Sequence, residues 1–189
     1  MTATLAPLFI LSGPSGSGKS TVLKRVLADA GVPLRLSVSA TTRAPRPGEQ
    51  HGREYYFWTP EQFEAAVKAG NFLEWAKVHG NCYGTLRSEV DPWRRKGMGV
   101  VLDIDVQGAA QLRPLFPEAV TIFVRTSSED TYRKRLEARG TETFEAIERR
   151  VQAARPELEQ SGEYQYQVIN DELETAVAEL RAIVRRHFV

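Results

Sequence analysis

Short apolar runs alternate with longer amphipathic segments along most of the chain. Uninterrupted apolar runs predict buried strands of a parallel sheet, because such strands face hydrophobic side chains on both sides. We expect strands at 8–11, 99–105, 120–124 and 167–170, and helices at 20–30, from about 106 and at 172–187. This alternation predicts an α/β fold with three layers, in which helices cover both faces of a parallel sheet.

The region 37–90 interrupts this rhythm with shorter strand-like stretches and turns. LRLSVSA (34–40) and EYYFW (54–58) have strand-like composition, and TPEQFEAAVKAG predicts a helix that is capped by Thr59 and ends at Gly70. FLEWAKVHGNCYGT mixes strand and turn signals, and 86–96 suits a helix with Pro92 in its first turn. We therefore expect a small α+β lobe inserted into the core.

Segment 126–155 is rich in charge, so we expect it to cover a site rather than pack a core. Helices are expected at 127–139, stopped by Gly140, and at 143–155, stopped before Pro156. The predicted organisation is a single domain over 6–187, with a core at 6–36, 97–125 and 156–187, an inserted lobe at 37–90 and a helical lid at 126–155.

Composition narrows the class of protein. With 189 residues, 42% of them hydrophobic and 26% charged, the chain suits one soluble globular domain. Its net charge of +1 argues against a general attraction to nucleic acid or membranes. A single cysteine, Cys82, excludes an intrachain disulfide, and we see neither a signal peptide nor an apolar run of about 18 residues, so we expect a cytoplasmic protein.

The stretch GPSGSGKST behind the first strand matches the phosphate-binding pattern G-x-x-x-x-G-K-[ST]. Small residues allow backbone N–H groups to face phosphates, Lys19 reaches the β- and γ-phosphates, and the Ser20 hydroxyl binds Mg²⁺. A kinase, a motor, a switch and an inactive scaffold are all compatible with such a loop. The expected ATP-binding residues here are Gly13, Pro14, Ser15, Gly16, Ser17, Gly18, Lys19, Ser20 and Thr21.

Two further stretches carry candidate chemistry. Asp103 and Asp105 end a buried strand with their side chains on the same face, where a carboxylate can serve the outer shell of a metal. Whether Asp103 reaches the metal directly, through water or not at all stays open. Arg43 and Arg46 lie in a turn stiffened by prolines, which suits bidentate capture of a phosphate.

Six motifs together resemble the guanylate kinase family. They are GPSGSGKST, SVSATTRAPRPGE, GREYYF, FLEWAKVHGNCYGT, LDIDVQG and RLEARGTET, and the resemblance runs from about Pro7 to the last helix. It implies a P-loop NTPase core, a GMP-binding lobe and a lid. The implied GMP-binding residues are Ser39, Arg43, Arg46, Tyr55, Glu74, Tyr83, Thr85 and Asp105.

The chemistry of these residues suits GMP. A carboxylate such as Glu74 can accept both N1–H and N2–H₂ of guanine, whereas adenine would present a lone pair at N1. The hydroxyl of Ser39 or Thr85 can donate to O6. The resemblance also implies that Arg135, Arg139 and Arg150 neutralise the transferring phosphoryl group and that Asn170 contacts adenine. Arg133, Lys134 and Arg149 are expected to be solvated.

These residues predict an enzyme that converts ATP and GMP, and we expect dGMP, to ADP and GDP. The second pKa of the acceptor phosphate is about 6, so its oxygen needs no general base at neutral pH. Mg²⁺ is the expected cofactor, the partners are ATP and GMP, and no nucleic acid, membrane or obligatory protein partner is expected. The alternatives are a non-catalytic scaffolding module of the same fold and a kinase for another phosphorylated acceptor.

Overall fold

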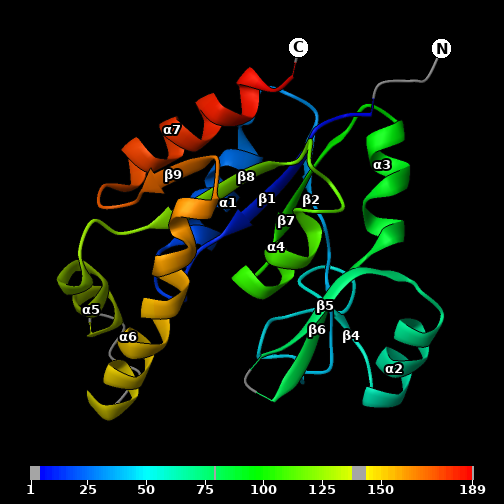
Figure 1. Cartoon of the computed structure of the whole chain (residues 1–189), viewed down its shortest axis with the longest axis horizontal. Helices are drawn as coiled ribbons and strands as arrows, with labels where there is room; N and C mark the ends of the chain where they lie inside the picture. The colour runs from blue at the N-terminus through cyan, green and yellow to red at the C-terminus, as the bar shows by residue number, and fades with distance from the viewer. Residues whose placement is uncertain (1–4, 79, 138–143, 189) are drawn as a thin grey trace.

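A five-stranded parallel sheet lies at the centre of the computed structural model, which describes residues 5–78, 80–137 and 144–188. The strand order is β2-β7-β1-β8-β9, so strands distant in sequence are neighbours in the sheet (Figure 1). Each of these four pairings is parallel. The strands are β1 (Leu8–Ser12), β2 (Leu34–Leu36), β7 (Gly99–Asp103), β8 (Val120–Arg125) and β9 (Tyr166–Ile169).

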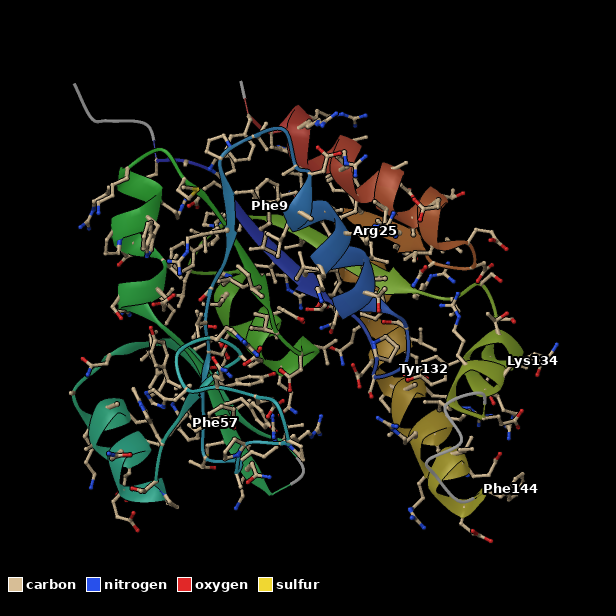
Figure 2. The ribbon with its side chains drawn as sticks, turned by 180° about the vertical axis from the view of Figure 1, so that it is seen from behind. Phe9, Arg25, Phe57, Tyr132, Lys134 and Phe144 are labelled. Atoms are coloured by element: carbon tan, nitrogen blue, oxygen red, sulfur yellow. The ribbon has the colours of Figure 1, made fainter. Side chains whose placement is uncertain are left out.

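Alternating side chains of the sheet fill two separate hydrophobic clusters. Phe9 and Leu11 of β1 pack with residues of α1 and α7, whereas Leu8 and Ile10 pack with residues of α4 and with Val90 (Figure 2 labels Phe9). Every residue of β1 is buried. The expected α/β fold with helices on both faces is thus confirmed. The helices are α1 (Lys19–Ala28), α3 (Asp91–Arg95), α4 (Val106–Leu112) and α7 (Leu173–Arg186).

A second, four-stranded sheet is inserted between β2 and β7, with the order β4-β3-β6-β5. β5 and β6 form an antiparallel hairpin, and Phe63 of the adjoining helix α2 stacks on Phe72 with ring centroids 4.5 Å apart. In Figure 1 this sheet projects to one side of the core. Its elements are β3 (Ala40–Thr41), β4 (Tyr56–Phe57), α2 (Pro60–Lys68), β5 (Phe72–Val78) and β6 (Asn81–Leu86).

The run 34–40, which the sequence suggests is one strand, is divided between the two sheets. Leu34–Leu36 pairs with β7 in the core, and Ala40–Thr41 pairs with β4 and β6 in the second sheet. The residues between them carry the chain from one sheet to the other. The expected helix at 86–96 is similarly divided, into a short 3₁₀ turn, η1 (Arg87–Glu89), and α3, with Pro92 in the first turn of α3 as predicted.

The helices α5 (Glu129–Glu137) and α6 (Phe144–Glu159) pack on each other. Tyr132 and Leu136 of α5 are buried against Ile147, Val151 and Ala154 of α6, so this charged segment has an apolar core of its own, contrary to expectation. In the view of Figure 1 the pair extends from the core toward the same side as the second sheet.

The prediction that a helix ends before Pro156 is wrong, because α6 continues through Pro156 to Glu159. A proline inside a helix leaves the carbonyl four residues earlier without its N–H partner. That carbonyl belongs to Gln152, and both residues are exposed, so water can bind the carbonyl at little cost. A second 3₁₀ turn, η2 (Gln160–Glu163), follows.

Across residues 5–78, 80–137 and 144–188, every helix is too short or too polar to cross a lipid bilayer.

Candidate active site

The phosphate loop joins the end of β1 to the start of α1. Gly13 has φ 148° and a side-chain carbon there would lie 2.1 Å from the Val124 carbonyl oxygen, so no larger residue fits. Gly18 has φ 81°, and its missing side chain makes room for the Asn170 amide. The glycines therefore let the loop press against β8 and the end of β9, which sets the position of the first turn of α1.

The remaining loop residues surround this turn. Pro14 and Ser17 are buried, Ser15, Ser20 and Thr21 are exposed, and Gly16 is half-buried. A side-chain carbon at Gly16 would lie 3.0 Å from Leu136, so α5 packs directly on the loop.

Polar side chains from outside the loop also hold it. The Asn170 amide, only 3% exposed, donates to the Ser17 carbonyl at 2.7 Å. Arg135 of α5 donates to the same carbonyl at 3.4 Å and to the Asp171 carbonyl at 2.9 Å. Arg135, predicted to be catalytic, and Asn170, predicted to bind ATP, are thus brought together at the loop. Contact of Asn170 with adenine stays a prediction.

Arg150 of α6 donates to the Ser15 hydroxyl at 2.6 Å, so a second arginine of the predicted lid contacts the loop. Arg139, the third arginine predicted for the lid, lies outside the described residues. Arg133 was expected to be solvated, but its guanidinium is half-buried and forms an ion pair with Glu148 of α6. Lys134 and Arg149 are exposed as expected, and Lys134 points away from the core (Figure 2).

Lys19 forms an ion pair with Asp103 at the end of the neighbouring strand β7. Burial lowers the pKa of Lys19 to about 8, although the negative charges of Glu157 and Asp105 act to raise it. The ammonium group therefore lies among several carboxylates at the mouth of the loop. Glu157, on α6, was not identified from the sequence, because only the fold brings the end of α6 near Lys19.

Glu74 is the most deeply buried carboxylate of the site, with 5% of the residue exposed. It pairs with Thr85 across the β5–β6 hairpin, and the Thr85 hydroxyl donates to Glu74 Oε1 at 2.6 Å. A side-chain carbon at Gly108 would lie 2.6 Å from Glu74 Oε2, so α4 closes the other side. Burial, reinforced by the charge of Asp105, raises the pKa of Glu74 to about 7.

Asp105 follows β7 and is close enough to both Glu74 and Lys19 to influence the pKa of each. Its side chain accepts a hydrogen bond from Gly108 N at 2.8 Å and caps the start of α4. It raises the pKa of Glu74 and opposes the lowering of the Lys19 pKa by burial. The charge of Asp105 thus acts on both Glu74 and Lys19.

The predicted phosphate-binding residues of the second sheet gather around Arg43. Its guanidinium lies 5.5 Å from the centre of the Tyr55 ring, and the Tyr55 ring meets that of Tyr83 edge-on at 6.0 Å. Both carboxylate oxygens of Glu49 accept from Arg43 at 2.9 Å, and one of them also accepts from Arg46 N at 2.7 Å.

Glu49 was missed in the sequence, although it ends the motif SVSATTRAPRPGE. The Arg46 side chain is exposed, and the carbonyl of half-buried Ser39 accepts from Tyr56 N at 2.9 Å. Of the predicted acceptor residues, Thr85 and Asp105 lie near Glu74, and Tyr55 and Tyr83 lie near Arg43.

Comparison with known proteins agrees with this geometry. The family model described as guanylate kinase matches residues 6–187. A guanylate kinase of Fusobacterium nucleatum is 46% identical over 96% of this chain and 97% of its own length, and one of Rubrobacter xylanophilus is 47% identical over 95% and 93%. A crystal structure of guanylate kinase from Anaplasma phagocytophilum superposes with a TM-score of 0.78 at 29% identity, covering 98% of this chain and 88% of that one.

The family match extends over the phosphate loop, the second sheet and both helices α5 and α6, so the resemblance is not confined to a single motif. The chain belongs to the guanylate kinase family.

Proposed function

We propose that this chain transfers the γ-phosphoryl group of ATP to GMP in one in-line step, giving ADP and GDP, and that it accepts dGMP as well. The observation that carries the assignment of residues is the buried Glu74–Thr85 pair, held against Gly108. A buried carboxylate without a cationic partner is unfavourable for folding. A ligand with two adjacent N–H donors, as guanine has, would compensate this cost.

The acceptor base is recognised by complementary hydrogen bonds. Ionised Glu74 accepts N1–H and N2–H₂ of guanine, and a hydroxyl donates to O6. Because the Thr85 hydroxyl already donates to Glu74, we assign the O6 donor to the hydroxyl of Ser39. Adenine would set its N1 lone pair against the carboxylate and be rejected.

The acceptor phosphate is bound by Arg43, Arg46, Tyr55 and Tyr83. Glu49 holds the Arg43 guanidinium in a fixed orientation, which lowers the entropy lost when phosphate binds. The phosphate oxygen attacks as an anion, so the site needs positioning and charge neutralisation rather than a general base.

The donor phosphates lie on the backbone N–H groups of the loop, at the positive end of α1. Lys19 contacts the β- and γ-phosphates, and Arg135, Arg139 and Arg150 neutralise charge on the transferring group. Lys19 is paired with Asp103, so it has to turn toward the phosphates when ATP binds.

Mg²⁺ fits the donor set, although no group of three or more acidic, histidine or cysteine side chains in the described residues can hold a metal alone. The Ser20 hydroxyl and the Asp103 carboxylate offer hard oxygen ligands, and Mg²⁺ in kinases is commonly held by few protein groups together with phosphates and water. When bound, the ion neutralises charge on the β- and γ-phosphates.

The retained loop and lid argue against a scaffolding module, since Lys19 and Ser20 as well as Arg135 and Arg150 surround one site. A kinase for a different acceptor would leave the buried Glu74 unmatched.

The acceptor is tested by measuring ADP release from ATP with a panel of GMP, dGMP, AMP, CMP and UMP. We expect GMP and dGMP to exceed AMP by at least about 100-fold in kcat/KM, because AMP leaves Glu74 unpaired. Equal rates with AMP and GMP would overturn the guanine assignment.

Replacing Lys19 by Met should lower kcat by about 100-fold or more, because it removes a positive charge from the transferring phosphoryl group. GMP binding, measured by calorimetry, should stay within about twofold, because Lys19 belongs to the ATP half of the site. Lys24→Met, on the exposed surface of α1, is the matched control and should leave both unchanged. Loss of GMP binding in Lys19→Met would contradict the separation of the two half-sites.

Replacing Glu74 by Gln should weaken GMP binding by about 1–3 kcal/mol. Wild-type affinity should rise as pH increases through about 7, since only the ionised carboxylate accepts two donors. The GMP phosphate titrates at about pH 6 with the wild type and with the variant alike. The difference between their pH profiles of GMP affinity therefore reports on Glu74. A variant with the same affinity and pH profile as the wild type would exclude this role.

The same substitution should stabilise the free protein at neutral pH. The pKa of Glu74 is about 7 when folded, above its ordinary value, so the folded state holds the proton more tightly and loses stability as pH rises between these values. Above pH 7 we expect the free energy of unfolding of Glu74→Gln, measured by urea denaturation, to exceed that of the wild type by about 1–3 kcal/mol. The exposed Glu64→Gln is the control.

Replacing Arg135 by Ala should lower kcat by about 10–1000-fold, because this guanidinium already lies at the phosphate loop. Lys134→Ala, one residue away and exposed, is the control for removing a positive charge from α5. Equal loss of single-turnover rate in both variants would show that the charge of the helix, not the position of Arg135, is what matters.

A further inference from the structure

Glu89 is a buried carboxylate outside the nucleotide-binding groups described above. It ends η1, directly after the second sheet, and is 9% exposed. Its side chain accepts from Arg35 Nη2 at 2.7 Å, from the Tyr56 hydroxyl at 2.9 Å and from Val38 N at 3.3 Å. These donors come from β2 of the core, from β4 of the second sheet and from the link between the two sheets.

Arg35 is held from two further directions. It donates from Nη1 to the Glu89 carbonyl at 3.1 Å, and its guanidinium lies 4.1 Å from the centre of the Trp93 ring on α3. Both the backbone and the side chain of Glu89 are therefore bound by one core arginine, which restricts the rotation of η1 against β2.

Glu89 lies where the chain returns from the second sheet to the core. The second sheet is inserted between β2 and β7, so the backbone enters it after Leu36 and leaves it after Leu86. Glu89 lies on the outgoing connection and binds Val38 on the incoming one. Its hydrogen bond to Tyr56 adds a strand of the sheet itself. One carboxylate thus joins both connections and the inserted sheet.

Stability alone is a weak explanation for such a group. Burying an ion pair has a desolvation cost that often cancels its Coulombic gain, so an apolar cluster of similar volume would stabilise the connection as well. Hydrogen bonds are directional and apolar contacts are not. A carboxylate with three donors therefore fixes the angle between the elements that supply them.

We propose that Glu89 is a positioning residue for the acceptor nucleotide, which sets the orientation of the second sheet relative to the phosphate loop. This inference rests on the proposed function, because Val38 and Tyr56 adjoin the acceptor residues Ser39 and Tyr55. An error of about 1 Å in the placement of reacting groups can lower a rate by about 100-fold. A loosened connection would displace the GMP half of the site while leaving the ATP half in place.

The test is steady-state kinetics of Glu89→Gln in the full chain, with ATP and GMP varied separately. Gln keeps the size of the side chain, but it leaves Arg35 without a counter-charge and sets an amide donor among donors. We expect KM for GMP to rise about 10-fold and KM for ATP to change less than about twofold. GMP affinity without ATP, measured by calorimetry, should fall by the same factor.

Two further variants separate orientation from general loss of stability. Tyr56→Phe removes one donor and should raise KM for GMP by a smaller factor, and the double variant should show less than the product of the two effects. Glu118→Gln is the control for removing a carboxylate from an arginine pair, because the exposed Glu118 pairs at 3.1 Å with the buried Arg94 and lies outside both connections. It should leave KM for GMP unchanged at every assay temperature below its melting temperature.

An unchanged KM for GMP in Glu89→Gln, an equal rise for ATP, or an equal rise in Glu118→Gln would overturn the proposal. The wild-type rate with GMP tests the proposed function by itself, whereas the ratio of variant to wild type tests Glu89. A slow wild type therefore counts against the function, and a ratio near one counts against the role of Glu89.

Discussion

The burial of β1 is the constraint on which the rest of the structure depends. Its side chains alternate between two hydrophobic clusters, and its backbone pairs with β7 on one side and β8 on the other. A strand held on all sides cannot shift in register without exposing apolar surface. Its end therefore fixes where the phosphate loop begins, and the pairing of Leu11 with Asp103 brings an acidic residue beside that loop.

The second sheet solves a different physical problem, which is to present a carboxylate to a base without solvating it. Burial of Glu74 raises its pKa to about 7, although the hydrogen bond from the Thr85 hydroxyl acts to lower it. The same burial that disfavours the free, ionised carboxylate strengthens its hydrogen bonds to a matching ligand. Some stability of the folded chain is thereby exchanged for selectivity, as is common at functional sites.

Charge is the other problem, because two polyanionic nucleotides have to meet. Lys19 lies among Asp103, Asp105 and Glu157, so the site before substrate binding is balanced by the protein's own carboxylates. Arg43 is likewise held by Glu49, and Arg150 by Ser15. The cations are thus kept in defined orientations at modest cost until phosphates replace or join these partners.

Much of this was contained in the sequence. Apolar runs identified the core strands, because burial on both faces leaves a continuous hydrophobic pattern. The phosphate loop was evident from its glycines and Lys19. The family resemblance pointed to Arg135, Arg150 and Asn170, which contact the loop. Local pattern failed at 34–40 and at Pro156, where strand pairing and solvent exposure decided the outcome.

Only the tertiary structure decided the environment of each charge. Glu49, Glu89 and Glu157 are ordinary acidic residues in the sequence, and what distinguishes them is which arginine, lysine or backbone amide the fold brings near. The sequence by itself determined the elements and the chemistry available, since these follow from local composition. The burial of Glu74 and the joining of two connections by Glu89 depend on contacts between distant segments, which no local pattern specifies.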